Sequence, residues 1–170
     1  MSWIAVVATL VAIQRGAELL YARRNTAALL ARGGVEVGAG HYPLFVLLHG
    51  AWLLSLIATV PADQAPSWPW LGLFILLQLG RLWIIWSLGP YWTTRIVTLP
   101  QAPLVRRGPY RLMRHPNYAV AAAEIAVLPL AFGAWRIALL FSVLNAALLA
   151  WRIRVEESAL APRRRSAAPR

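Results

Sequence analysis

A basic segment broken by prolines, residues 107–118 with the sequence RGPYRLMRHPNY, lies between two long apolar blocks and contains the residues best suited to chemistry. Pro116 disfavours helical backbone at His115 and allows a new helix to begin at the proline. The first turn of such a helix offers backbone amide donors to an anionic group, and Arg111 and Arg114 add positive charge beside it. The segment indicates an anion-binding site, although taken alone it equally fits an ordinary turn at a membrane surface.

A second polar set lies in and just after the last apolar block. Asn145, Arg152 and Glu156 are spaced by seven and four residues, which places them along one face of a continuous helix. An interfacial arginine with an acidic partner four residues later is a structural explanation of the same spacing. The pattern predicts that the three side chains point together, whichever interpretation holds.

Four more charged residues stand inside apolar blocks, where an isolated charge is costly. Arg15 and Glu18 are three residues apart, so they share a helical face and can form an ion pair. Arg81 lies near the middle of the third block, and Glu124 follows Asn117 by seven residues in the fourth. We predict for Arg81 and Glu124 either an ion pair between helices or a ligand-binding role.

The composition indicates a membrane protein. The chain is 59% hydrophobic, has a formal net charge of +11 and has a mean hydropathy of +0.57. Membrane-spanning segments joined by basic loops keep such charges away from the apolar surface. The basic residues, all of them arginine, border the apolar blocks instead of forming one polar face, so we expect contact with anionic lipid and no nucleic-acid partner.

The residue types also limit the chemistry. With no cysteine, the chain has no disulfide, no thiolate nucleophile and no cysteine-bound metal. His41 and His49 lack histidine or carboxylate companions at the spacing of metal ligands, so no metal site is expected. No strand leads into a glycine-rich turn, as it would in a soluble nucleotide-binding fold.

The apolar blocks predict an all-α, polytopic membrane protein with about five transmembrane helices, in a single domain over residues 1–160. They run from about Trp3 to Leu20, Pro43 to Val60, Trp70 to Leu88, Tyr118 to Phe132 and Trp135 to Trp151. A helix needs about 17 to 25 residues to cross the hydrocarbon core. The last two blocks are shorter, and Pro129 with Gly133 predicts a tight helical hairpin. One long kinked helix from Tyr118 to Trp151 is the alternative.

The arginines predict an orientation for this arrangement. Five crossings put three basic regions on one side, namely residues 23–32, residues 95–114 and the tail, residues 161–170, which we expect to be disordered. The loop from Pro61 to Pro69 contains Asp63 and no basic residue, which fits the other side. Only Arg136, at the tip of the hairpin, departs from the pattern. We therefore expect the N-terminus outside and the C-terminus in the cytoplasm.

Taken together, residues 108–118 (GPYRLMRHPNY), Glu124 and residues 152–160 (RIRVEESAL) resemble the isoprenylcysteine carboxyl methyltransferase family of integral membrane enzymes. The likeness continues through residues 88–100 (LGPYWTTRIVTLP), residues 23–25 and residues 41–42. These features are similar to the small bacterial branch that includes alkylresorcinol and alkylpyrone O-methyltransferases. The resemblance implies a bacterial inner-membrane enzyme that uses S-adenosylmethionine and takes a lipophilic acceptor from the bilayer.

The resemblance also implies roles for particular residues. Those implied to bind the cofactor are Tyr110, Arg114, His115, Pro116, Asn117, Tyr118, Arg152, Glu156 and Glu157, and those implied to be catalytic are Glu124 and Arg152. The tail replaces residues that cover the site in many relatives, so a lid would be shorter or would come from His41 and Tyr42.

The acceptor is open between a phenol and an isoprenylcysteine-like carboxylate. The bacterial branch carries an acidic residue at the position of Glu124, which the eukaryotic prenylcysteine enzymes generally lack, so the resemblance favours a phenol. A phenol needs a base or a nearby cation to become a phenolate, and the candidates in the motifs are Glu124, His115 and the neighbourhood of Arg152. Of these we expect Glu124 to serve. A small transporter or a noncatalytic membrane scaffold would also accommodate the buried charges, but neither explains the two motifs together.

Overall fold

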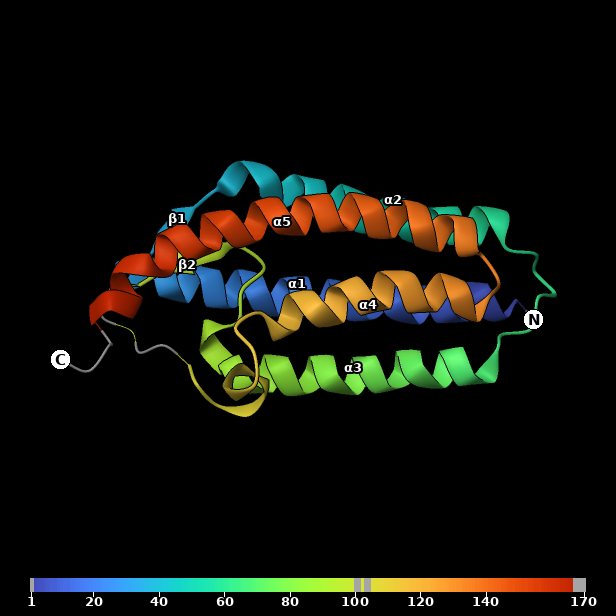
Figure 1. Ribbon diagram of the computed structural model, residues 1–170, viewed down its shortest axis with the longest axis horizontal. Coiled ribbons are helices and arrows are strands. Elements are labelled where there is room, and N and C mark those ends of the chain that lie inside the picture. Colours follow the sequence, from blue (N-terminus) through green and yellow to red (C-terminus); the bar gives the residue numbers. More distant parts are fainter. Residues whose placement is uncertain (1, 100–101, 103–104, 167–170) are drawn as a thin grey trace.

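Five long helices run side by side in alternating directions in the computed structural model of the chain (Figure 1). The structure describes residues 2–99, 102 and 105–166, with side chains as far as residue 161. The helices are α1 (Trp3–Ala31), α2 (Tyr42–Thr59), α3 (Trp68–Leu88), α4 (Pro116–Ala131) and α5 (Trp135–Ser166). Each predicted apolar block forms one of them, which confirms the all-α, polytopic fold class.

Length and composition qualify four of the helices as membrane spans, and α4, with 16 residues, is the shorter fifth. Large apolar side chains cover the outside of the bundle, with Leu47 67%, Leu54 68% and Leu76 64% exposed. In water, so much contiguous apolar surface would drive association. A lipid bilayer removes that cost because its hydrocarbon contacts these side chains directly.

The last two helices form the predicted hairpin. Helix α4 ends at Ala131 and α5 begins at Trp135. Gly133 has φ of 70° in the turn, and the amide of Ala134 donates to the carbonyl of Pro129 at 2.9 Å. The single long kinked helix is therefore wrong.

The apolar core occupies the half of the bundle nearer the N-terminus. Trp52 and Leu56 of α2 pack there with Ile125 and Leu128 of α4, and all four are at most 1% exposed. Phe141 of α5 joins the same cluster. The other half of the bundle contains polar side chains and cavities instead.

Two short strands cross that other end of the bundle. Strand β1 (Val35–Val37) pairs antiparallel with β2 (Ile96–Thr98), with Val35 opposite Thr98. Arg95 and Glu36 form an ion pair of 2.9 Å beside them. The sequence did not predict these strands because three residues are too few to give an alternating pattern. The pairing holds the connection between α3 and α4 against the segment that follows α1.

Two helices are longer than their apolar blocks. Helix α1 continues to Ala31, so Arg23 and Arg24 lie on a helix and not in the expected loop. Helix α5 continues to Ser166, so residues 161–166 of the tail expected to be disordered are helical. The rest of the tail lies outside the described residues.

Candidate active site

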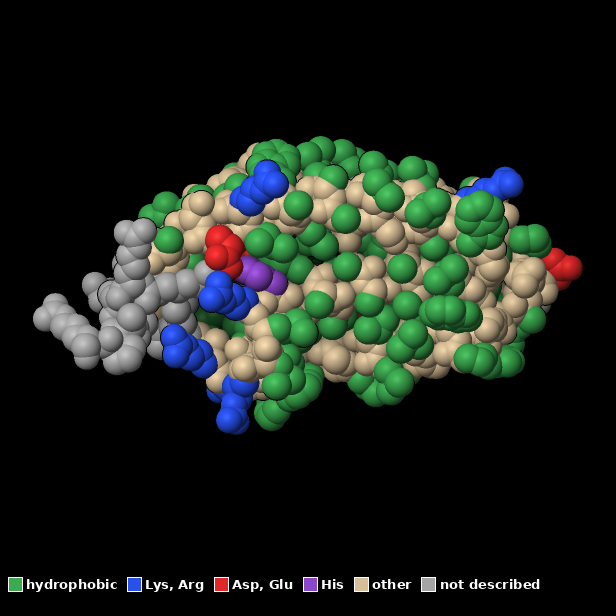
Figure 2. All heavy atoms as spheres, viewed as in Figure 1, with side chains coloured by type: hydrophobic (Ala, Val, Ile, Leu, Met, Phe, Trp, Pro, Cys, Tyr) green, Lys and Arg blue, Asp and Glu red, His purple; other side chains and the backbone are tan. Residues whose placement is uncertain are grey.

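A cavity of about 770 Å³ lies at the end of the bundle that carries the strands, between α5, the start of α4 and the α3–α4 connection. Basic, acidic and histidine side chains gather near this end (Figure 2). The volume is in the range typical of small-molecule sites. The side chains around it are Leu29, Leu88, Tyr91, Trp92, Thr93, Arg95, Ile96, Val97, Leu99, Ala102, Val105, Arg106, Tyr110, Arg111, Arg114, His115, Asn117, Tyr118, Arg152, Glu156 and Leu160.

The hydroxyl of Tyr118 connects the two polar motifs. It donates to a carboxylate oxygen of Glu156 and accepts from Nε of Arg152 at 2.8 Å. The guanidinium of Arg152 lies 5.6 Å from the centre of the Tyr118 ring and also donates to the carbonyl of Thr94 at 2.8 Å. Tyr118 of α4 and two of the three α5 side chains that were predicted to point together, Arg152 and Glu156, thus form one hydrogen-bonded network.

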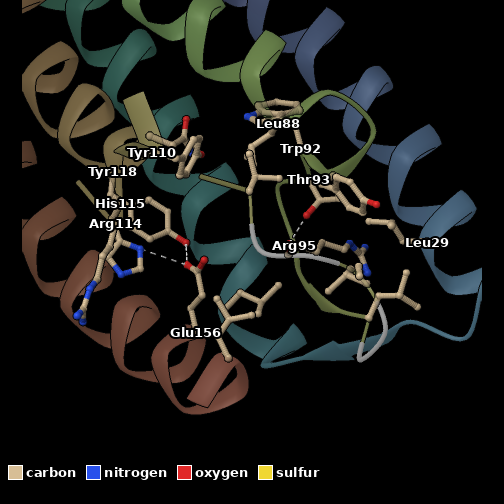
Figure 3. A pocket seen from close by; sticks show the side chains of 18 of the residues that line it. Leu29, Leu88, Trp92, Thr93, Arg95, Tyr110, Arg114, His115, Tyr118 and Glu156 are labelled. Atoms are coloured by element: carbon tan, nitrogen blue, oxygen red, sulfur yellow. Dashed lines mark hydrogen bonds and ion pairs between the residues drawn. The ribbon is translucent and has the colours of Figure 1, made fainter. Parts of the chain in front are cut away.

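His115 is held beside this network. Its ring stacks on Tyr118, with the centroids 5.3 Å apart and the planes 10° from parallel. Its Nε2 atom lies 3.0 Å from Oε1 of Glu157, and its Nδ1 atom lies 3.8 Å from Oε2 of Glu156. In Figure 3, Glu156 points from α5 toward His115 and Tyr118, while Trp92 and Thr93 lie across the cavity.

The short helical turn Gly108–Arg111 brings Tyr110 into the cavity. Gly108 has φ of 56°, and a Cβ atom there would collide with the Ser87 hydroxyl, so glycine is required. Burial raises the pKa of Tyr110, and the negative charge of Glu156 raises it further. Tyr110 therefore stays protonated at physiological pH and can donate a hydrogen bond to a ligand.

The α3–α4 connection supplies cavity residues that the sequence reasoning did not propose. Tyr91, Trp92 and Thr93 line the cavity, and Trp92 is 1% exposed. The Asn25 side chain fixes this segment by donating to the carbonyls of Trp92 at 2.8 Å and Gly89 at 3.2 Å. The feature of the sequence that could have indicated these cavity residues is the aromatic pair Tyr91–Trp92, which lies between a Gly-Pro turn and two threonines.

A second, smaller cavity of about 240 Å³ lies deeper among the helices. It shares four lining residues with the first cavity: Thr93, Asn117, Tyr118 and Arg152. Apolar side chains such as Leu53 and Leu149 form much of its wall. The two cavities therefore meet at the Tyr118 network.

A cluster of four charged side chains includes three that line the smaller cavity, Arg15, Glu18 and Arg81. Arg81 bonds to both carboxylate oxygens of Glu18 at 2.7 Å and approaches Glu124 at 3.4 Å. Arg15 contacts Glu18 at 2.9 Å and Glu124 at 2.5 Å. Both predicted ion pairs, Arg15 with Glu18 and Arg81 with Glu124, are confirmed as parts of one cluster.

Most residues proposed for cofactor binding surround the larger cavity: Tyr110, Arg114, His115, Asn117, Tyr118, Arg152 and Glu156. Pro116 is buried as the first residue of α4, and Glu157 contacts His115 without lining the cavity. Glu124, proposed as catalytic, is 1% exposed and borders neither cavity. Its contacts lie instead within the charge cluster.

One further expectation needs correction, and another stays a prediction. At the start of α4, the amide of Tyr118 donates to the carbonyl of His115 at 3.1 Å, and the ordinary helical hydrogen bonds begin with Ala119 at 3.2 Å, so the expected anion site at this helix start stays a prediction. His41 is not part of a lid, because it is 2% exposed and packs 5.5 Å from the Trp151 ring. Tyr42 lines the smaller cavity and not the larger one.

This architecture, with a polar cavity at one end of an apolar helical bundle, is that of an integral membrane protein with a site for a small molecule. The chain belongs to the isoprenylcysteine carboxyl methyltransferase (ICMT) family, because the sequence model of that family matches residues 70–162. The match includes both polar motifs and the α3–α4 connection. The protein is thus an integral membrane protein of a methyltransferase family.

Relatives extend the likeness over nearly the whole chain. The uncharacterized protein YpbQ of Bacillus subtilis (strain 168) is 42% identical over 164 residues, covering 94% of this chain and 96% of YpbQ. An uncharacterized protein of Haemophilus influenzae is 30% identical over 142 residues, covering 81% of this chain and 83% of the relative. No solved structure matches the chain.

Proposed function

We propose that this protein is an S-adenosylmethionine-dependent O-methyltransferase whose cofactor occupies the larger cavity and whose lipophilic acceptor occupies the smaller one. The observation that carries the proposal is the shared boundary of the cavities at Asn117, Tyr118 and Arg152. Methyl transfer requires two bound molecules whose reacting atoms approach to about 3 to 3.5 Å. Two cavities with a common polar wall meet that requirement.

The groups around the larger cavity fit the cofactor's chemistry. Arg106, Arg111 and Arg114 suit its carboxylate, and the Glu156 carboxylate suits its ammonium group or ribose hydroxyls. Nε1 of Trp92 is buried and has no hydrogen-bond partner within the described part of the chain. In this proposal a ring nitrogen of adenine accepts from that donor.

Bound S-adenosylmethionine supplies a methyl group on a positively charged sulfur, open to attack by an acceptor oxygen. The protein's work is then to align the acceptor, exclude water and favour the ionised oxygen. Arg152 suits the last task because it is 7% exposed, borders both cavities and carries a positive charge. We therefore assign Arg152 to stabilising a phenolate, and Tyr118 to holding Arg152 in place.

Glu124 has a different role in this proposal from that of a base facing the acceptor. Its carboxylate is engaged by Arg15 and Arg81, and it borders neither cavity. Glu124 instead orients Arg15, which does line the smaller cavity. This makes Glu124 a positioning residue.

Isothermal titration of the detergent-solubilised protein with S-adenosylhomocysteine tests the cofactor assignment. We expect saturable binding that falls at least about 10-fold in His115→Ala and Glu156→Ala, since each loses contacts worth about 1.5 kcal/mol or more to a charged group. Arg136→Gln is the control, because Arg136 lies at the other end of the bundle over Trp135. Absence of saturable binding to the unmodified protein would refute the proposal.

A further inference from the structure

His49 of α2 lines the smaller cavity with one ring nitrogen free. Its Nδ1 atom lies 2.8 Å from the carbonyl oxygen of Phe45, four residues earlier. A carbonyl only accepts hydrogen bonds, so Nδ1 carries the proton and Nε2 carries the lone pair. Among the described residues, Nε2 has no hydrogen-bond partner. The cavity wall therefore contains an imidazole nitrogen that can accept a proton.

Glu18 is the other side chain on this wall, within the described part of the chain, that commonly accepts protons near neutral pH. Arg81 donates to both of its carboxylate oxygens at 2.7 Å, and Arg15 and Gln14 donate to them as well. Protonation of Glu18 would disrupt these charge-assisted hydrogen bonds. His49 is thus the side chain on the wall that is available to take up a proton.

His49 lies close to the side chains that border both cavities. The ring of Phe45 is 5.4 Å from the guanidinium of Arg152, and His49 follows Phe45 by one helical turn, about 5 Å along the axis of α2. Tyr118 and Arg152 line the same cavity as His49. A compact acceptor head at the boundary of the cavities therefore meets Arg152 from α5 and His49 from α2.

We propose that His49 is the general base of the methyl transfer and accepts the proton of the acceptor hydroxyl at Nε2. The inference rests on the function proposed above and adds a catalytic residue to it. As the acceptor oxygen bonds to the methyl carbon, the carbon–sulfur bond breaks and its electron pair stays on sulfur, which becomes neutral. The O–H bond of the acceptor breaks and its proton moves to Nε2, while Arg152 stabilises the negative charge on oxygen. The imidazolium returns the proton to water after the product leaves.

The charges around His49 are compatible with a transient imidazolium. The titratable and charged groups that line the cavity with it, besides Tyr42 of α2 itself, are Arg15 and Glu18 of α1, Arg81 of α3, Tyr118 of α4 and Arg152 of α5. Glu18 and Glu124 balance the cations of α1 and α3. On that side the imidazolium therefore meets no excess of positive charge, and on the other side Arg152 faces the anionic oxygen.

The test compares two acceptors that share an alkyl chain and differ in the acidity of the hydroxyl, 3-pentadecylphenol and 3-pentadecyl-4-nitrophenol. At about pH 8.5 the nitro compound is already ionised, whereas an unsubstituted phenol, with a pKa of about 10, is mostly protonated. The single-turnover rate of full-length protein in detergent is measured with methyl-labelled S-adenosylmethionine. In His49→Gln we expect the rate for the phenol to fall at least about 100-fold, as for a lost general base. The rate for the nitrophenol should change less than about threefold, because that acceptor needs no base.

The matched control is His41→Gln, the same change at a histidine outside both cavity walls. It should leave the ratio of the two rates unchanged, because it removes no base from the acceptor's surroundings. Should His49→Gln not fold, His49→Asn is measured with the same two acceptors. The asparagine amide can still donate to the carbonyl of Phe45, but it has no basic nitrogen.

The outcomes separate this inference from the proposed function. If His49→Gln lowers both rates alike, or keeps full activity on the phenol, His49 is not the base. Failure of the unmodified protein to methylate the phenol, with S-adenosylhomocysteine binding intact, also overturns the inference and leaves the cofactor assignment standing. If S-adenosylhomocysteine itself does not bind, the proposed function fails.

Discussion

The hydroxyl group of Tyr118 makes the hydrogen bonds that organise the site. It joins α4 to α5 through Glu156 and Arg152, and its ring supports His115. Both hydrogen bonds involve a charged partner, and such bonds contribute about 1.5 to 3 kcal/mol each. Tyr118 thus determines how the acidic and basic side chains of α5 face the larger cavity.

At the scale of the residue, we predict that Tyr118→Phe weakens S-adenosylhomocysteine binding about 10-fold or more, because Arg152 and Glu156 lose the group between them. Isothermal titration measures the effect. Tyr21→Phe is the control, since its ring stacks on Trp92 from outside the cavity wall. Unchanged affinity in Tyr118→Phe would show that the network does not shape the cofactor site.

The resemblance of two motifs to a known family was enough to nominate most of the larger cavity's polar wall. Arg114, His115, Tyr118, Arg152 and Glu156 were proposed from that resemblance and do surround it. Glu124 was proposed as catalytic on the same ground, but a resemblance between sequences does not indicate what a side chain faces. Its burial between two arginines became evident only from the packing of three helices.

At the scale of the elements, the charge cluster ties α1, α3 and α4 together. Arg15 and Glu18 come from α1, Arg81 from α3 and Glu124 from α4. Their hydrogen bonds extend to Gln14 and Gln78, which bond to each other at 2.9 Å. Satisfied polar networks of this kind fix one arrangement of neighbouring helices, because any shift leaves buried charges unpaired.

We predict that Glu124→Gln lowers the free energy of unfolding by about 3 to 5 kcal/mol, because it leaves the buried Arg81 and the half-buried Arg15 short of a counter-charge. Thermal unfolding in detergent, followed by circular dichroism, measures the loss. Glu36→Gln is the matched control, because its ion pair with Arg95 is surface-exposed and should contribute less than about 1 kcal/mol. Equal stability of the two variants would contradict the prediction.

The connection between α3 and α4 shows what local sequence patterns miss. Its β2 strand is three residues long and becomes a strand only through pairing with β1. Trp92 enters the cavity because Asn25 on α1 holds the backbone around it. Both contacts link segments far apart in the chain, and neither leaves a periodic signal.

At the scale of the whole molecule, five helices in alternating directions put the N-terminus and the C-terminus at opposite ends (Figure 1). The loop with Asp63 shares the N-terminal end, and Arg32 at the end of α1 shares the other. By the tendency of basic loops to remain in the cytoplasm, we propose that the cavity end is cytoplasmic. A charged cofactor would then enter from the water on that side.

Cysteine labelling tests this orientation, because the chain contains no cysteine and an introduced one is the only thiol. In intact spheroplasts, a membrane-impermeant maleimide should label Asp63→Cys and not Arg32→Cys, because only the former faces outward. After lysis both should react to a similar extent. Labelling of Arg32→Cys in intact spheroplasts would reverse the proposed orientation.

The sequence alone determined that the chain crosses a bilayer, where its helices lie and which motifs carry polar chemistry. The hydrocarbon core of a bilayer sets these features within each helix, because each crossing needs its own run of apolar residues and its own backbone hydrogen bonds. The tertiary structure decided that two cavities adjoin, that Glu124 balances a charge cluster, and that the Asn145 amide lines the smaller cavity without a partner among the described residues. These features depend on which faces of different helices meet, and the spacing of residues along one helix does not specify its neighbours.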